Sequence, residues 1–188
     1  DIARFTSGGP DEFRNVVSRL DYREEYSFIE REFDGRVHLD EAVLGLGESS
    51  DSIYVYQLLL HLWTVRSLTR LALDTGLEPA PHPTVKHYPA EGRPQPVSKI
   101  SVQPLVAYSL RDDDEKPYLL EFPVRLTLRG TIPELGRFLR GLQREGRFFP
   151  LRHIEVHKQV PPLRNRNYDR LEVTLECSSF FQLEDTDA

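Results

Sequence analysis

An alternating strand that gives way to a helix and then to a second alternating strand occupies residues 124–158. Val124, Leu126 and Leu128 alternate with polar neighbours, and this period of two predicts a strand with one buried and one solvated face. The period then becomes that of a helix, and residues 151–160 alternate again. The segment contains no nucleophile, phosphate-binding loop or metal cage, so it constrains the fold and not a reaction.

The helix inside this segment is predicted to begin at Thr131 and to end near Gly146. Thr131 and Glu134 have the T-x-x-E spacing of a capping box. The apolar stripe of the helix consists of Leu135, Phe138, Leu139 and Leu142, and the opposite face is predicted to carry Arg137, Arg140, Arg144 and Arg147. A row of arginines is typical of a solvated helix face, and the alternative is a docking stripe for an acidic partner.

The same helix–strand–strand order occurs once earlier in the chain. Residues 52–76 predict the longest helix, which Gly76 ends in the left-handed conformation. Strands at 97–110 and 118–130 follow and are joined by the charged loop 111–116. The sequence therefore predicts an α+β, ferredoxin-like sandwich in a permuted αββαββ order. Its four-stranded sheet has two helices on one face, and the second and fourth strands are central.

Prolines set three expectations for the strands. Pro104 fits an edge strand because proline has no N–H to donate to a ladder. Pro123 lies in a strand predicted to be central, so regular pairing is expected to begin at about Val124. Six prolines within residues 79–96 predict an extended, poorly packed link.

The chain is predicted to divide into an N-terminal helical and irregular extension, residues 1–50, and a ferredoxin-like domain, residues 51–188. A first helix is expected behind Gly9 and Pro10, because apolar residues follow at helical spacing. These are Phe13, Val16, Val17 and Leu20. Residues 22–47 show neither period clearly and predict a short helix with irregular connections.

Composition excludes several classes of function. The formal net charge of −6 argues against nucleic acid as the main partner. Cys177 is the single cysteine, so neither an intrachain disulfide nor a cysteine-based zinc site can form. No apolar run approaches the roughly 18 residues that span a bilayer. Because the chain begins with Asp1 and contains no methionine, we expect an upstream segment that could hold a membrane anchor.

Two short motifs resemble binding sites but are better explained by structure. Gly45 and Gly47 form part of a G-x-G-x-x-G pattern, yet a turn and a helix cap explain them because the preceding stretch is polar. His153 and His157 share one face of a strand about 13 Å apart, which is too far for one metal ion to bridge. We therefore predict no catalytic residue, no metal site and no cofactor.

The segments FPVRLTLRGTIPELGRFLRGLQREGRFFPLRHIEVHK and DRLEVTLECSSFF resemble the C-terminal domain of PilO, the inner-membrane alignment protein of type IV pilus machines. The related GspM proteins of type II secretion share the plan. The resemblance covers about residues 97–181. It implies the periplasmic domain of an inner-membrane-anchored bacterial protein. Residues 1–50 depart from the family because they show no sustained heptads.

The resemblance implies a non-enzymatic assembly component that acts as a homodimer or as a heterodimer with a related PilN/PilO-like protein. The strand at 151–160 is expected at a sheet edge without internal proline, which favours pairing by strand addition. A proline at Glu155 is expected to weaken that pairing. The predicted interface residues are Ile154, Glu155, Val156, His157, Arg137, Arg140 and Arg144. The alternative is a ferredoxin-like small-molecule sensor, which would need a polar pocket.

Overall fold

The fold is seen in a computed structural model, in which the structure describes residues 9–41, 44, 54–87, 94–111, 117–144, 147–158 and 170–183. The helices are α2 (Gly9–Val16), α3 (Arg19–Glu32), α4 (Val55–Thr75) and α5 (Ile132–Gly141). The strands are β1 (Glu78–Pro79), β2 (Pro81–His87), β3 (Gln95–Ser98), β4 (Ile100–Val102), β5 (Val106–Tyr108), β6 (Leu119–Gly130), β7 (Gln143–Arg144), β8 (Arg147–Phe148), β9 (Leu151–Lys158) and β10 (Leu171–Gln182).

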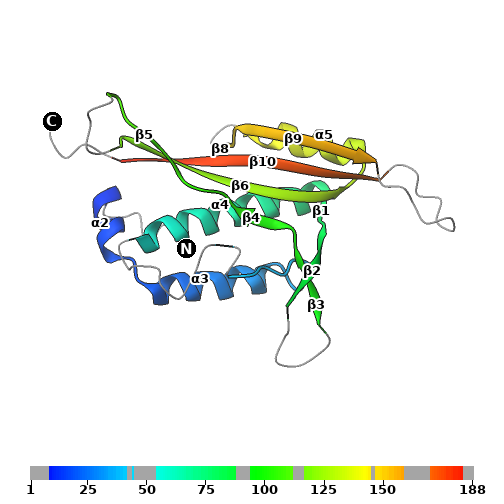
Figure 1. Cartoon of the computed structure of the whole chain (residues 1–188), viewed down its shortest axis with the longest axis horizontal. Helices are drawn as coiled ribbons and strands as arrows, with labels where there is room; N and C mark the ends of the chain where they lie inside the picture. The colour runs from blue at the N-terminus through cyan, green and yellow to red at the C-terminus, as the bar shows by residue number, and fades with distance from the viewer. Residues whose placement is uncertain are drawn as a thin grey trace.

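The main sheet is built on two long antiparallel strands, β6 and β10, which pair from Leu119↔Gln182 to Gly130↔Leu171. β9 pairs with the other side of β10 and forms one edge, whereas β1, β4 and β5 pair with the other side of β6 (Figure 1). The predicted α+β class is confirmed, and nothing in the described strand order conflicts with the ferredoxin-like arrangement. Among the described residues the sheet has six strands instead of the predicted four, because the strand predicted at 97–110 is divided between β4 and β5 and because β1 also pairs with β6.

Helices α4 and α5 contact each other, which places them on the same face of the sheet. The Arg137 side chain of α5 donates from Nη2 to the Thr75 carbonyl at the end of α4, at 2.9 Å. A methyl group added to Gly141 would lie 2.6 Å from Leu71 of α4. Phe138 is fully buried beneath α5, so the apolar stripe of this helix forms part of the core.

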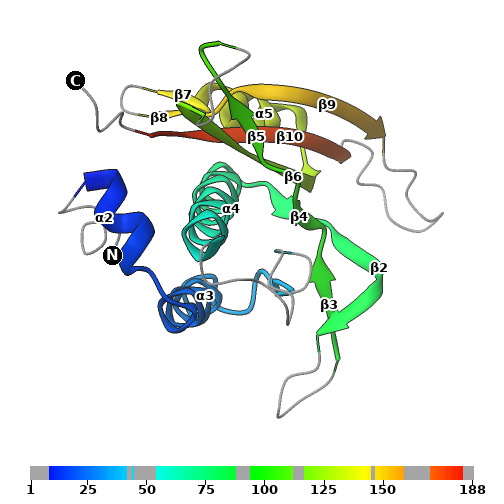
Figure 2. The ribbon, with the colours of Figure 1, turned by 60° about the vertical axis from the view of Figure 1, so that its left-hand side comes forward.

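Helix α4 is buried on two sides because α3 covers the face that the sheet does not (Figure 2). Trp63 of α4 stacks on Phe13 of α2 at 5.7 Å, and its indole Nε1 donates to Glu25 of α3 at 3.1 Å. One hydrophobic cluster runs from Phe13 to Cys177. A helix that is apolar around most of its circumference requires such a third layer. The division at residue 50 stays a prediction, and none of the described helices is long and apolar enough to cross a membrane.

The first predicted helix, expected to follow Gly9 and Pro10 and to include Leu20, is interrupted after Val16. A second helix, α3, begins at Arg19 and continues to Glu32, further than the short helix expected within residues 22–47. α2 ends at Val16, and Ser18 caps the 14-residue α3. The Ser18 N–H donates to Asp21 Oδ2 at 2.9 Å, and the Asp21 N–H donates to Ser18 Oγ at 3.3 Å. This reciprocal cap restarts the helix in a new direction. Leu20 is consequently 65% exposed instead of belonging to the apolar stripe.

The described part of the predicted link at 79–96 is extended and mostly exposed or half-buried, as expected, but its ends pair as strands instead of forming a simple link. β2 pairs with β3 at Pro81↔Ser98, Lys86↔Pro96 and His87↔Gln95, and this broken register leaves Pro83 out of the ladder. The Ala80 N–H donates to the Thr127 carbonyl of β6 at 2.8 Å. Prolines therefore shape this hairpin without preventing it. The predicted caps at 50–52, the glycines at 45 and 47 and residues 112–116 of the charged loop lie outside the described residues.

The expectation that pairing begins at Val124 is wrong, because β6 pairs with β10 from Leu119 onward. The Pro123 carbonyl accepts a hydrogen bond from the Gln103 N–H at 2.9 Å, on the side away from β10. The N–H and C=O of one strand residue lie on the same side, so the donor that Pro123 lacks would also point away from β10. On that side of β6 the ladder is already interrupted at Pro104, between β4 and β5, so the missing donor of Pro123 costs little pairing.

Candidate interaction surface on strand β9

The backbone of β9 alternates between groups that bond to β10 and groups that point outward. The Thr127 N–H of β6 donates to the Lys99 carbonyl, and the Thr127 carbonyl accepts from the Ala80 N–H. Both groups therefore point away from β10. The partner of Thr127 across the β6–β10 ladder, Thr174, must therefore bond on the other side, to Glu155 of β9. The Glu155 N–H thus faces β10, and a proline there would disturb the internal ladder instead of the edge.

It follows that Ile154 and Val156 present their backbone N–H and C=O groups at the edge of the sheet. No strand among the described residues pairs with that side of β9. Unpaired backbone groups in an edge strand form a template for another strand. We call this face the β9 edge and define it by residues 153–157.

The apolar side chains of the β9 edge are half-exposed although they lie on the helix-covered face of the sheet. Ile154 stands opposite Leu175, and Val156 opposite Val173, both of which are buried. Ile154 is nevertheless 40% and Val156 50% exposed. The helical layer thus covers these two side chains only in part, and a second protein could complete this burial.

On the other face of β9, two imidazoles flank one carboxylate. His153 Nε2 lies 2.9 Å from Glu155 Oε1, and His157 Nε2 lies 3.6 Å from Glu155 Oε2. The hydrogen bond from His153 is the main cause that lowers the pKa of the Glu155 carboxyl below its usual value. The sequence placed these histidines on one face of the strand and treated them as surface residues. The structure adds that both side chains reach the same carboxylate.

The neighbouring charges on this face of the sheet are paired among themselves. Glu172 of β10 accepts hydrogen bonds from Arg129 at 2.9 Å and from Lys99 at 3.3 Å. Glu176 accepts one from Arg125 at 3.0 Å. These ion pairs leave the His153–Glu155–His157 cluster as a separate group of ionisable side chains on β9.

The predicted arginine stripe is not formed as one helix face. α5 ends at Gly141, five residues before the expected end at Gly146, and Arg144 instead lies in β7 opposite Arg147 of β8. The ladder between β7 and β8 follows the helix directly, and the Leu142 carbonyl accepts from the Phe149 N–H at 2.9 Å instead of from a further helical turn. Arg137 is bonded to the end of α4. All three predicted docking arginines are exposed, but Arg137 and Arg140 lie on α5 and Arg144 lies on β7.

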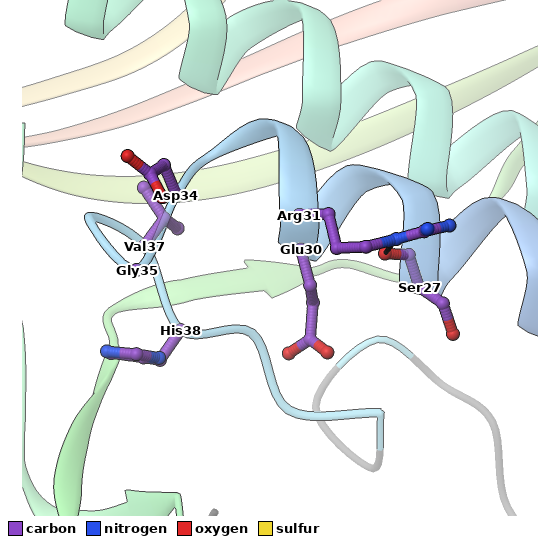
Figure 3. A pocket seen from close by; sticks show the side chains of 7 residues that line it. All are labelled: Ser27, Glu30, Arg31, Asp34, Gly35, Val37 and His38. Carbon is purple, nitrogen blue, oxygen red and sulfur yellow. Dashed lines mark hydrogen bonds between the residues drawn. The ribbon is translucent and has the colours of Figure 1, made fainter.

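A hollow of about 480 Å³ at the end of α3 lacks the converging polar groups of a binding site (Figure 3). Glu30 points away from the helix and accepts from the Tyr26 hydroxyl, whereas Arg31 lies along the helix and donates to the Ser27 carbonyl. His38 points in another direction. The labelled side chains thus do not aim at a common point.

A second cavity, of about 310 Å³, lies between the β2–β3 hairpin and the sheet. Its two cationic side chains, Lys99 and Arg125, are those already held by Glu172 and Glu176. Cys177 lies in the core, where burial raises the pKa of its thiol to about 12. A thiol of this kind is not a nucleophile at neutral pH.

These features define an α+β domain whose most distinctive exposed element is an unpaired strand edge. By sequence, the chain matches no protein-family model and no curated protein. It is similar in fold to a crystal structure of a protein from Akkermansia muciniphila, with a TM-score of 0.60 and 10% identity over 92% of this chain and 82% of that one.

A further Akkermansia muciniphila structure, of a protein solved without its transmembrane region, matches with a TM-score of 0.53 and 10% identity over 90% of this chain and 88% of that one. PilO, the type 4 fimbrial biogenesis protein of Pseudomonas aeruginosa, also matches, with a TM-score of 0.41 and 17% identity over 97% and 95% of the two chains. The predicted resemblance to a PilO-like domain is confirmed as a likeness of fold.

Proposed function

We propose that this chain is a non-enzymatic assembly domain of a type IV pilus or type II secretion-like envelope machine, and that it acts by protein–protein association. One observation carries the proposal. Ile154 and Val156 combine outward-facing backbone groups with half-exposed apolar side chains, which is the combination that strand addition requires.

Two further observations support the choice of this edge and of this setting. The opposite edge is divided between β4 and β5 at residues 103–105 and is a poorer template. The setting rests on the resemblance of residues 97–181 to PilO and GspM. A similar structure was solved without its transmembrane region, which supports a membrane anchor for this fold, and the periplasmic location rests on the PilO resemblance alone.

The partner is a second copy of this chain or a related PilN/PilO-like protein, and not a nucleic acid. A strand added to β9 would form hydrogen bonds with the backbone N–H and C=O groups of Ile154 and Val156. Its own side chains would then help the helices to bury the side chains of these two residues. The net charge of −6 argues against a phosphate backbone as the main partner, and Arg125 and Arg129 are already paired with Glu176 and Glu172.

Sedimentation velocity at tens of micromolar tests this proposal with a matched pair of variants. Val156→Lys places a charge where a paired strand would bury an apolar side chain, and it is expected to weaken self-association by about tenfold or more. Leu110→Lys changes another exposed apolar residue, which is 71% exposed near the end of β5, and is expected to have no effect. Equal effects of the two variants, or a wild type that stays monomeric, would contradict self-association through β9.

A further inference from the structure

The sequence of β9 is nearly symmetric about Glu155. Read outward from this residue, Ile154 matches Val156, His153 matches His157, and a basic residue follows on each side, Arg152 and Lys158. Two antiparallel strands related by a two-fold axis pair residues whose numbers have a constant sum. A register centred on Glu155 therefore places each residue from Arg152 to Lys158 opposite one of its own chemical kind.

The hydrogen-bonding sides of β9 agree with this register. Ile154 and Val156 point outward, so Ile154 of one copy and Val156 of the other would exchange backbone hydrogen bonds. Their side chains would then meet on the apolar face. Glu155, His153 and His157 would occupy the non-hydrogen-bonded positions, where Cα atoms lie only about 4.5 Å apart and side chains are closest.

We propose that two copies pair through β9 in the antiparallel register centred on Glu155, and that His153 of one copy and His157 of the other then bind a divalent transition-metal ion. This inference rests on the proposed function and adds a partner, a register and a ligand to it. Among the described residues of one chain, no group of three side chains can hold a metal ion. The site would exist only in the pair.

The ligand set of the paired strands suits zinc. Directly opposite side chains have Cβ atoms about 5 Å apart, so the two imidazoles could share one ion. Both imidazoles already lie within 3.6 Å of the Glu155 carboxylate, which would supply a third ligand, and water would supply a fourth. Two nitrogens and one carboxylate oxygen are a ligand set that Zn²⁺ accepts.

Charge explains why the ion would control the pairing. In this register the two Glu155 carboxylates face each other, and like charges directly opposite are destabilising. The remaining carboxylates on this face, Glu172 and Glu176, are held by Lys99, Arg129 and Arg125. Arg152 lies 3.4 Å from the buried Glu121, which offsets its repulsion from Lys158 of the other copy. An ion at each histidine pair would neutralise the two Glu155 carboxylates that stay opposed.

Sedimentation velocity with EDTA, Zn²⁺ or Mg²⁺ tests the metal site. Zn²⁺ is expected to lower the dimer dissociation constant by about tenfold or more, with one ion bound per chain, and Mg²⁺ is expected to have no effect. His153→Ala and His157→Ala should each remove the response to zinc, whereas the matched change His82→Ala, in β2, should retain it. If zinc leaves the dimer dissociation constant unchanged while Val156→Lys abolishes the dimer, the metal site is overturned and the proposed function stands. A chain that is monomeric with and without zinc would contradict the metal site and self-association through β9, and would leave a related protein as the partner of the proposed function.

Disulfide trapping in metal-free buffer tests the register separately. Glu155→Cys should cross-link to its own copy, because directly opposite residues have the Cα separation that a disulfide needs. His153→Cys should not cross-link alone, but it should do so when mixed with His157→Cys. Cys177 is buried, so the unmodified chain serves as the control. Efficient cross-linking of His153→Cys with itself would overturn the register.

Discussion

His61 of α4 packs edge to face against Phe122 of β6, with the ring centroids 4.9 Å apart and the planes at 84°. The imidazole is 6% exposed, and its Nε2 has no hydrogen-bond partner among the described residues. Burial lowers the pKa of His61 from 6.5 to about 4, while a hydrogen bond with the Gln103 backbone acts in the opposite direction. The interface between α4 and the sheet therefore contains a histidine that stays neutral in the folded chain.

This contact predicts a loss of stability in acid. Between about pH 6.5 and pH 4 the unfolded chain binds a proton at residue 61 that the folded chain does not bind. The free energy of unfolding therefore falls as the pH falls through this window, by roughly 2–4 kcal/mol for this group. Urea unfolding at pH 7 and near pH 4.5 should show a smaller loss for His61→Gln than for the wild type. Equal losses for the two proteins would contradict the assignment.

Phe138→Ala is expected to lower the free energy of unfolding by roughly 3–5 kcal/mol, the usual cost of removing a buried phenylalanine ring. Phe138 is 0% exposed and lies where α5 faces the core. Ile132→Ala on the same helix is the matched control, because Ile132 is 69% exposed and its loss should cost less than about 0.5 kcal/mol. Denaturant unfolding monitored by circular dichroism measures both, and a loss below about 1 kcal/mol for Phe138→Ala would show that the stripe is not core.

Replacing Arg137 by alanine is expected to lower the free energy of unfolding more than replacing Arg140, although both are exposed arginines of α5. Arg137 donates from Nη2 and Nε to the Thr75 carbonyl, at 2.9 and 3.3 Å, and so satisfies a carbonyl at the C-terminal end of α4. Arg137→Ala should lower the free energy of unfolding by about 1 kcal/mol, and Arg140→Ala by less than about 0.5 kcal/mol. If association is affected more by Arg137→Ala than by Arg140→Ala in folded protein, Arg137 acts in docking and not as a cap.

Trp63 is the single tryptophan of the chain and reports on the packing of α2 and α3 against α4. Because one hydrophobic cluster includes residues from both sides of position 50, we expect one unfolding transition. The midpoint seen by Trp63 fluorescence and the midpoint seen by far-ultraviolet circular dichroism should coincide. An earlier fluorescence transition would show that residues 1–50 dissociate from the rest before it unfolds.

Patterns within short stretches of sequence correctly predicted several strands and helix ends. Long alternation identified β6, β9 and β10, and the Thr131–Glu134 spacing located the start of α5, where the Thr131 N–H donates to Glu134 at 2.7 Å. Gly76 ends α4 with φ at 94°, as its position before Leu77 predicts. These features depend on residues close together in the chain, so sequence reading could find them.

The remaining features depend on contacts between distant segments. Pro123 fits a central strand because the ladder is already broken at Pro104. Residues 81–87 form a strand only because residues 95–98 pair with them. For the candidate site, the sequence predicted that β9 forms an edge. Which of its residues point their N–H groups outward could be found only from the ladder through Thr174 and Thr127.

The most direct test of association through β9 is residue-resolved amide hydrogen exchange, measured at low and at high protein concentration. In the dilute chain, the amides of Ile154 and Val156 should exchange rapidly because they point outward, whereas the amide of Glu155 should be protected by β10. At concentrations where the protein associates, Ile154 and Val156 should become protected and Glu155 should change little. Association that leaves the amides of Ile154 and Val156 unprotected would contradict pairing through this edge.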